Sequence, residues 1–153
     1  MDKNYVLMSI KTKYANKIFN GTKIWEYRKN LPKELVSGET TIVVYSSKVD
    51  RAIVGEFTVG TILKCSLDEL MEQTGCENDP EAREWFEGYY KGKDVCCAIE
   101  VTSPIRYTSE IKLDNIKLAV PGFLPPQNFI YIRKDSPLAT VVKSAERGCN
   151  EKE

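Results

Sequence analysis

The sequence predicts an α+β domain built on a small mixed or antiparallel β-barrel. Six to eight short runs with β-branched or alternating apolar residues are spread along the whole chain, and each is expected to form a strand. Only three or four short stretches have helical spacing, and the middle two are inserted between strands. The length of 153 residues, with 42% hydrophobic and 29% charged residues, is typical of one globular domain. We expect a single domain over residues 1–148 and a loose tail over residues 149–153.

The N-terminal third of the chain predicts three strands and one helix. Residues 5–10 (YVLMSI) are mostly apolar and predict the first strand. A short helix follows, with Thr12 as its expected N-cap and Gly21 as the residue that ends it. Residues 23–28 (KIWEYR) alternate in polarity and predict a strand. Residues 40–46 (TTIVVYS) are rich in β-branched side chains and predict a buried strand.

The rest of the chain predicts further strands around a helical insert. A capping box that begins at Ser66 starts one helix, and Pro80 at a first helical position starts another. Residues 114–126 are expected to be a loop, and the last helix is expected to run from Pro137 to a stop at Gly148. The remaining strands are expected at residues 52–59, 62–65, 95–101, 105–107 and 129–132.

Composition excludes several classes of protein. No apolar run approaches the roughly 18–20 residues that a membrane span needs, and the N-terminal apolar stretch is too short for a signal peptide. We therefore expect a cytoplasmic protein without a membrane partner. The five cysteines are odd in number and irregularly spaced, which predicts reduced thiols rather than a disulfide framework.

The chain contains no histidine, and this limits the chemistry that it can perform. A Ser-His-Asp triad, a Cys-His dyad and a zinc site with histidine ligands are all excluded. We expect no metal site and no cofactor. If the protein is an enzyme, its proton transfers fall to Lys, Glu, Asp, Tyr or an activated hydroxyl.

Charge is divided unevenly along a chain whose net charge is zero. Residues 1–51 hold ten basic and five acidic residues, whereas residues 68–87 hold eight acidic residues and only Arg83 as a base. A polarised surface is one interpretation, with a phosphate-facing patch built from the first fifty residues. Ordinary solvated charge is the other interpretation, and charge alone does not separate the two.

Segment 21–28 (GTKIWEYR) is the most informative stretch of the sequence. A glycine ends a helix, and a strand begins directly after it. Lys23 stands at the start of that strand, and Glu26 and Arg28 project to the same side of it. Inside a barrel, two charges on one strand face indicate that the face is wet or that the charges are paired; the other interpretation is a solvent-exposed edge with a weak surface ion pair.

This segment resembles the opening of an ASCH domain, a member of the PUA-like superfamily. The family's hallmark is a short helix followed by G-x-K-x-x-E-x-R, and Gly21, Lys23, Glu26 and Arg28 match it position by position. The resemblance continues in residues 43–60 and, more weakly, in residues 94–107 and 125–132, and it covers about residues 5–133. It implies a PUA-like β-barrel with short helices packed over one opening, and a cleft beside segment 21–28.

The resemblance also implies a function in RNA binding. Most ASCH domains are regarded as RNA-binding or RNA-associated, although one small bacterial type removes the acetyl group from acetylated cytidine and another is described as a ribonuclease. In the first type a threonine nucleophile stands three residues after the lysine, where this chain has Glu26. The glutamate of those relatives would fall near Glu72 or Glu77.

We therefore expect an RNA- or nucleotide-binding protein, with RNA or a nucleotide-like small molecule as its partner. A metal-independent hydrolase of RNA or of an acylated nucleoside is an alternative, with Lys23 as base or oxyanion stabiliser and Glu26 as general acid or base. A protein-interaction module is a second alternative. Ligand identity, oligomeric state and pathway are left open. The residues expected to contact a ligand are Lys11, Gly21, Lys23, Glu26, Arg28, Tyr45, Ser46, Ser47 and Tyr89.

Overall fold

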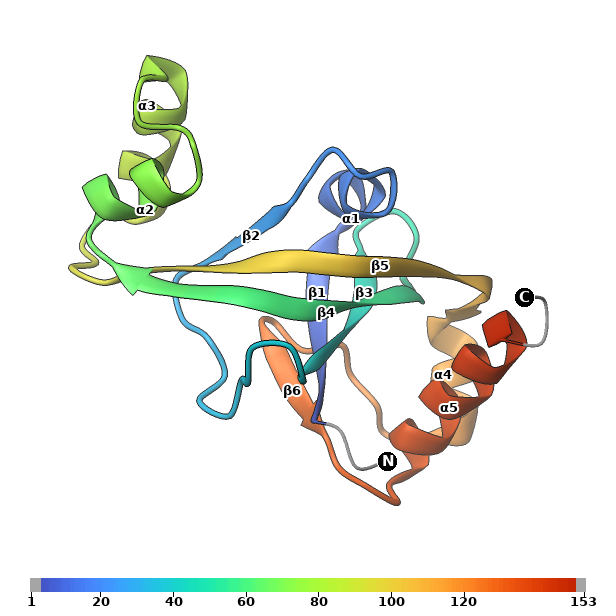
Figure 1. The fold of residues 1–153 in the computed structure, drawn as a ribbon. Helices are drawn as coiled ribbons and strands as arrows, with labels where there is room; N and C mark the ends of the chain where they lie inside the picture. Colours follow the sequence, from blue (N-terminus) through green and yellow to red (C-terminus); the bar gives the residue numbers. More distant parts are fainter. Residues whose placement is uncertain (1–3, 151–153) are drawn as a thin grey trace.

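A computed structural model describes residues 4–150 as one six-stranded sheet accompanied by five helices (Figure 1). This confirms the predicted α+β class. In chain order the elements are β1 (Tyr5–Lys11), α1 (Thr12–Phe19), β2 (Trp25–Arg28), β3 (Thr41–Ser47), β4 (Ala52–Cys65), α2 (Leu67–Gln73), α3 (Pro80–Tyr89), β5 (Cys96–Lys112), α4 (Leu113–Ala119), β6 (Phe129–Ile132) and α5 (Pro137–Asn150).

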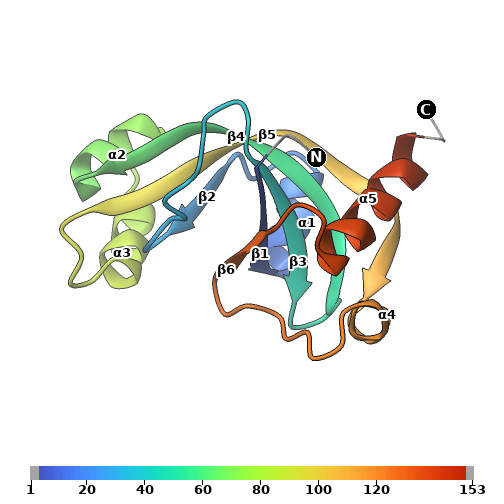
Figure 2. The same cartoon turned by 90° about the horizontal axis from the view of Figure 1, so that it is seen from below.

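The sheet is mixed and has the strand order β2-β5-β4-β3-β1-β6. β1 and β3 are parallel, and all other neighbouring strands are antiparallel. Figures 1 and 2 show that the sheet curls, with α2 and α3 at one end of the long β4–β5 ribbon and α4 and α5 at the other. Because the sheet curls, the edge strand β2 turns toward the opposite edge strand, β6, and its neighbour β1.

Three of the predicted helix starts form as expected, and the last of them is Pro137, where α5 begins. The Ser66 hydroxyl oxygen accepts a hydrogen bond from the backbone N–H of Glu69, which caps α2. Asp79 caps α3 through its carboxylate, and Pro80 occupies the first turn. Thr12, however, does not cap α1, because Lys11 is the N-cap residue and makes no side-chain cap bond. The Thr12 hydroxyl instead donates to the carbonyl of Ser47 at the end of β3, at 2.7 Å.

Several strand and loop boundaries differ from those expected. The predicted strands 52–59 and 62–65 are one strand, β4, because a register shift between Val59 and Ile62 absorbs the break. The break expected at Pro104 lies within β5, where Ser103 takes a positive φ of 47° and the ladder continues to Lys112.

The C-terminal third is more helical than the sequence predicts. The expected loop 114–126 begins with α4, because Leu113 and Ile116 lie one turn apart and both are buried. Helix α5 continues past Gly148 to Asn150. Residues 151–153 of the expected tail lie outside the described residues.

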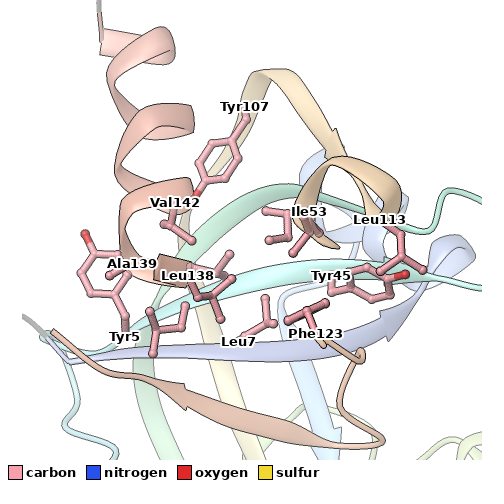
Figure 3. Close-up of a cluster of buried hydrophobic side chains, with 13 residues drawn as sticks. Tyr5, Leu7, Tyr45, Ile53, Tyr107, Leu113, Phe123, Leu138, Ala139 and Val142 are labelled. Carbon is pink, nitrogen blue, oxygen red and sulfur yellow. The ribbon is translucent and has the colours of Figure 1, made fainter. Parts of the chain in front are cut away.

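Buried side chains fill the space between the sheet and its helices. Figure 3 shows Leu138 and Val142 of α5, with Leu113 of α4, packed over Leu7 and Ile53 of the sheet. A second cluster lies under α1, and a third lies under α2 and α3. This packing anchors the helices that flank the cleft described below. None of the helices in residues 4–150 is long and apolar enough to span a membrane.

Candidate functional site

A cleft of about 1110 Å³ opens between the two ends of the curled sheet. Its walls come from the ends of β1 and β3, from β2, from α1 and α3, and from the segment around α4. Seven of the nine residues expected to contact a ligand line it, namely Lys11, Lys23, Glu26, Arg28, Tyr45, Ser47 and Tyr89.

A buried ion-pair network forms one wall of the cleft. The Nε atom of Arg28 lies 2.9 Å from Oε2 of Glu26, and Nζ of Lys23 lies 3.6 Å from Oε1. The side chains of Glu26 and Arg28 are only 9% exposed. Alternation along β2 accounts for this arrangement, because it turns Glu26 and Arg28 inward on the same face. The solvent-exposed edge considered for this segment is therefore wrong, and the charges face a cleft.

Arg28 also connects strands that are not paired in the sheet. One terminal nitrogen donates to the carbonyl of Ser9 on β1, at 2.8 Å. The other donates to Oδ1 of Asn128, just before β6, at 3.4 Å. The planar guanidinium has donors in a fixed fork and suits such multiple contacts. Arg28 thus pairs with Glu26, and its remaining donors connect β2 to β1 and to the segment before β6.

Lys23 is the most desolvated lysine of the cleft. Its side chain is 16% exposed, and its ammonium donates to the carbonyl of Trp25 at 2.6 Å. The nitrogen lies 5.5 Å and 5.0 Å from the ring centres of Tyr14 and Tyr27, within the range of cation–π attraction. Burial lowers the pKa of Lys23, and the Glu26 carboxylate opposes part of that effect.

The turn between β3 and β4 brings further basic groups to the cleft. The Ser46 hydroxyl lies 2.9 Å from both Thr12 Oγ1 and Asp50 Oδ2, and the N–H of Asp50 donates to Thr12 Oγ1 at 3.1 Å. Lys48 and Arg51 take positive φ values of 81° and 50° within this turn. Strained backbone of this kind is concentrated at functional sites.

Ser46 and Gly21, the other two residues expected to contact a ligand, do not line the cleft. Ser46 is completely buried behind the wall, where its hydroxyl orders the turn. Gly21 takes a φ of +85°, which glycine adopts without a steric cost, and it ends α1 before β2 begins. Tyr45 reaches the cleft although it is 98% buried; burial raises its pKa, and Arg51 opposes the effect.

The charge of the cleft is strongly one-sided. Among the described residues that line it, the only carboxylate is that of Glu26. The basic residues that line it are Lys11, Lys23, Arg28, Lys48, Arg51 and Lys117. Five of these come from the first 51 residues, so the fold gathers the basic half of the sequence on one concave surface. A cleft of this kind concentrates anionic ligands.

Helix α3 forms the aromatic side of the cleft. Trp85 and Tyr89 both line it, and their rings are stacked with centres 5.0 Å apart. The Tyr89 hydroxyl donates to the carbonyl of Tyr27 at 3.1 Å, which fixes α3 against β2. Figure 2 shows α3 beside β2. Glu72 and Glu77, near which a further catalytic carboxylate was expected, are exposed and do not line the cleft.

Some lining residues were missed by the sequence analysis. Ser9 lies in an apolar strand, and its hydroxyl donates to the carbonyl of Pro126 at 2.6 Å. Lys117 lies on the unexpected helix α4, and residues 124–127 follow it. A charge plot would mark Lys117, but only the fold brings it to the cleft. Among the described residues no cluster of three or more His, Cys, Asp or Glu side chains could hold a metal ion.

Comparison with known proteins identifies a family. The model of the ASCH domain matches residues 8–117 of this chain. The chain is 26% identical over 137 residues to an ASCH domain-containing ribonuclease of Zymomonas mobilis, with 88% of each protein covered.

Solved structures share the fold. The crystal structure of ASCH from Zymomonas mobilis is similar with a TM-score of 0.77 and 22% identity, over 93% of this chain and 96% of that chain. The N-terminal domain of Staphylothermus marinus McrB is similar with a TM-score of 0.55 and 12% identity, over 94% and 93% of the two chains. At these identities the likeness is one of fold.

The pKa of Lys23 gives a first test of the site. In a pH titration followed by NMR of the lysine side chains, we expect Lys23 to lose its proton below the ordinary pKa of 10.5, because burial disfavours the ammonium. Glu26→Gln should lower the pKa further, because the carboxylate favours the charged lysine.

Exposed Lys112 is the matched control in the same spectra. Its hydrogen bond to Glu110 raises its pKa, and Glu26→Gln should leave it unchanged. A Lys23 that titrates as high as Lys112 would contradict the described environment of the cleft.

Proposed function

This chain belongs to the ASCH domain family, and on that premise we propose that it binds RNA in the basic cleft beside segment 21–28. The observation that carries the proposal is the charge of the cleft, where six basic side chains face a single carboxylate. Phosphate contacts by Lys and Arg supply most of the affinity of proteins for nucleic acids. Because Glu26 is paired with Arg28 and Lys23, it opposes an approaching phosphate only weakly.

The spread of basic groups along the cleft favours RNA over a single nucleotide. The cleft, of about 1110 Å³, is slightly larger than the roughly 300–1,000 Å³ that is typical of small-molecule pockets. Lys11, Lys48 and Lys117 come from three separate segments and so offer several phosphate contacts along its length. The Ser47 side chain and the aromatic rings of α3 supply the hydroxyl and ring contacts that RNA-binding surfaces use.

The concave site also argues against the protein-interaction alternative. That alternative expects Glu26 and Arg28 on a flat, exposed sheet face, whereas both are buried in the wall of a cleft. An amidohydrolase of acylated nucleosides has little support as well. Glu26 stands where those relatives have a threonine nucleophile, and its carboxylate is held by Arg28.

Metal-independent cleavage of RNA is a second candidate, favoured by Lys23. Such cleavage forms a bond from the ribose 2′-oxygen to the adjacent phosphorus and breaks the bond to the 5′-oxygen. The 2′-hydroxyl loses a proton and the leaving oxygen gains one. Burial lowers the pKa of Lys23 and so favours the neutral amine that this step needs, although the nearby Glu26 carboxylate opposes part of the effect. The neutral amine accepts the first proton, and the ammonium that forms returns it to the leaving oxygen. The relative from Zymomonas mobilis is named a ribonuclease.

Binding is tested by removing one exposed charge of the cleft. We expect Lys117→Gln to weaken the binding of fluorescein-labelled total tRNA about fivefold at low salt. The variant loses one contact between a lysine and an RNA phosphate, and such a contact at the surface contributes about 1 kcal/mol. The slope of log affinity against log salt should become shallower by about one. Lys91→Gln, which removes an exposed lysine outside the cleft, is the control and should match the wild type. Equal affinities and slopes for all three proteins would refute the proposed surface.

Cleavage is tested with end-labelled tRNA incubated in chelator and separated on a denaturing gel. The ribonuclease candidate predicts fragments ending in a cyclic phosphate from the wild type and none from Lys23→Ala. Intact RNA in both lanes would remove cleavage of tRNA from consideration and leave binding as the proposed function.

A further inference from the structure

The stacked pair Trp85–Tyr89 is unusual because a large aromatic residue is left half exposed. Trp85 is 46% exposed, even though Tyr89 lies parallel to it within 13°. The two residues are four apart on α3, which places them on the same face of the helix. Both residues line the cleft.

Contacts with Phe86 and with β2 hold the stacked pair in place. Phe86 is buried and contacts Trp85 edge-on with ring centres 5.1 Å apart, and it contacts Tyr27 of β2 at 4.8 Å. Tyr89 is fixed by its hydrogen bond to the carbonyl of Tyr27. A platform with this support loses little side-chain entropy when a flat ligand stacks on it.

A cation lies next to the pair. The ammonium of Lys29 lies 5.2 Å from the ring centre of Tyr89, on the segment that leaves β2. The pair therefore combines flat rings with a nearby positive charge. Proteins that bind single-stranded nucleic acids use this combination, with bases on aromatic rings and backbone phosphates on Lys and Arg.

The surroundings of the stacked pair favour a single strand over a duplex as the ligand. Beyond the pair, α2 and α3 present exposed acidic residues, among them Asp68, Glu81, Glu84 and Glu87. The one arginine of α3, Arg83, pairs with Asp68 at 3.0 Å. A duplex carries phosphates on both of its edges and buries its base faces in the helical stack. It therefore offers no unpaired base to Trp85, and the acidic residues of α2 and α3 provide no phosphate contacts of their own.

We propose that Trp85 and Tyr89 form a stacking platform for an unpaired nucleobase, so that the cleft takes single-stranded RNA in preference to duplex RNA. This proposal rests on the proposed function and deepens it by naming the substrate class. The backbone of the strand follows the basic wall from β1 and the β3–β4 turn, and one base lies on the exposed face of Trp85.

The test compares three fluorescein-labelled ligands of equal length by fluorescence anisotropy: oligoadenylate, the same ribose-phosphate chain without bases, and duplex RNA. The proteins are the wild type, Trp85→Ala, Trp85→Phe and the control Val95→Ala, which trims an exposed apolar side chain outside the cleft. Thermal unfolding of each variant reports whether the fold is retained, and Trp85→Phe keeps a ring at the position.

We expect Trp85→Ala to bind oligoadenylate about tenfold more weakly than the wild type, as the loss of one base–aromatic stack predicts. Its affinity for the chain without bases should not change, Trp85→Phe should be intermediate, and Val95→Ala should match the wild type. The wild type should bind oligoadenylate more tightly than duplex. The proposal is overturned if Trp85→Ala matches the wild type on oligoadenylate, or loses the same factor on the chain without bases. Either result leaves the proposed RNA-binding function standing. That function is refuted if the wild type binds none of the three ligands.

Discussion

The guanidinium of Arg28 is the contact on which the cleft depends. The sheet curls until its two ends face each other, but β2 is not paired with β1 or β6. Arg28 spans that gap by binding Glu26 on its own strand, Ser9 on β1 and Asn128 before β6. Removing one partner of a buried ion pair is strongly destabilising, so the partners of Arg28 act together. Nζ of Lys23 lies 3.6 Å from the other oxygen of Glu26, so the three charged positions of the Gly-x-Lys-x-x-Glu-x-Arg pattern form one electrostatic network.

A second hydrogen-bond network arranges the turn between β3 and β4 beside the cleft. Thr12 at the start of α1 binds the end of β3, and with Ser46 and Asp50 it fixes a turn whose backbone is strained at Lys48 and Arg51. The two networks have different roles. The pairs around Arg28 neutralise the charge that they bury, whereas the turn leaves its basic groups open to the cleft. The result is a basic groove with an aromatic side, which suits a flexible anionic chain with flat bases.

Much of this site could be predicted from the sequence. Alternation in residues 23–28 placed Glu26 and Arg28 on one face, and the charge count located the basic half of the chain. Other features depend on contacts between distant residues, which local patterns do not contain. Ser46 is turned inward by Thr12, 34 residues away. Lys23 precedes β2, so strand alternation does not govern its side chain. Helix α4 is short and is followed by a Gly- and Pro-rich stretch, so the sequence pattern predicted a loop where α4 and Lys117 lie.

The central claim is that RNA occupies the cleft between the two ends of the curled sheet. The most direct measurement is a titration of isotope-labelled protein with single-stranded RNA, followed by the backbone amide resonances. The account predicts that the largest shifts fall on Lys11, Lys48 and Lys117, together with residues 85–89 of α3. Shifts confined to α5, with the amides of the cleft unchanged, would contradict it.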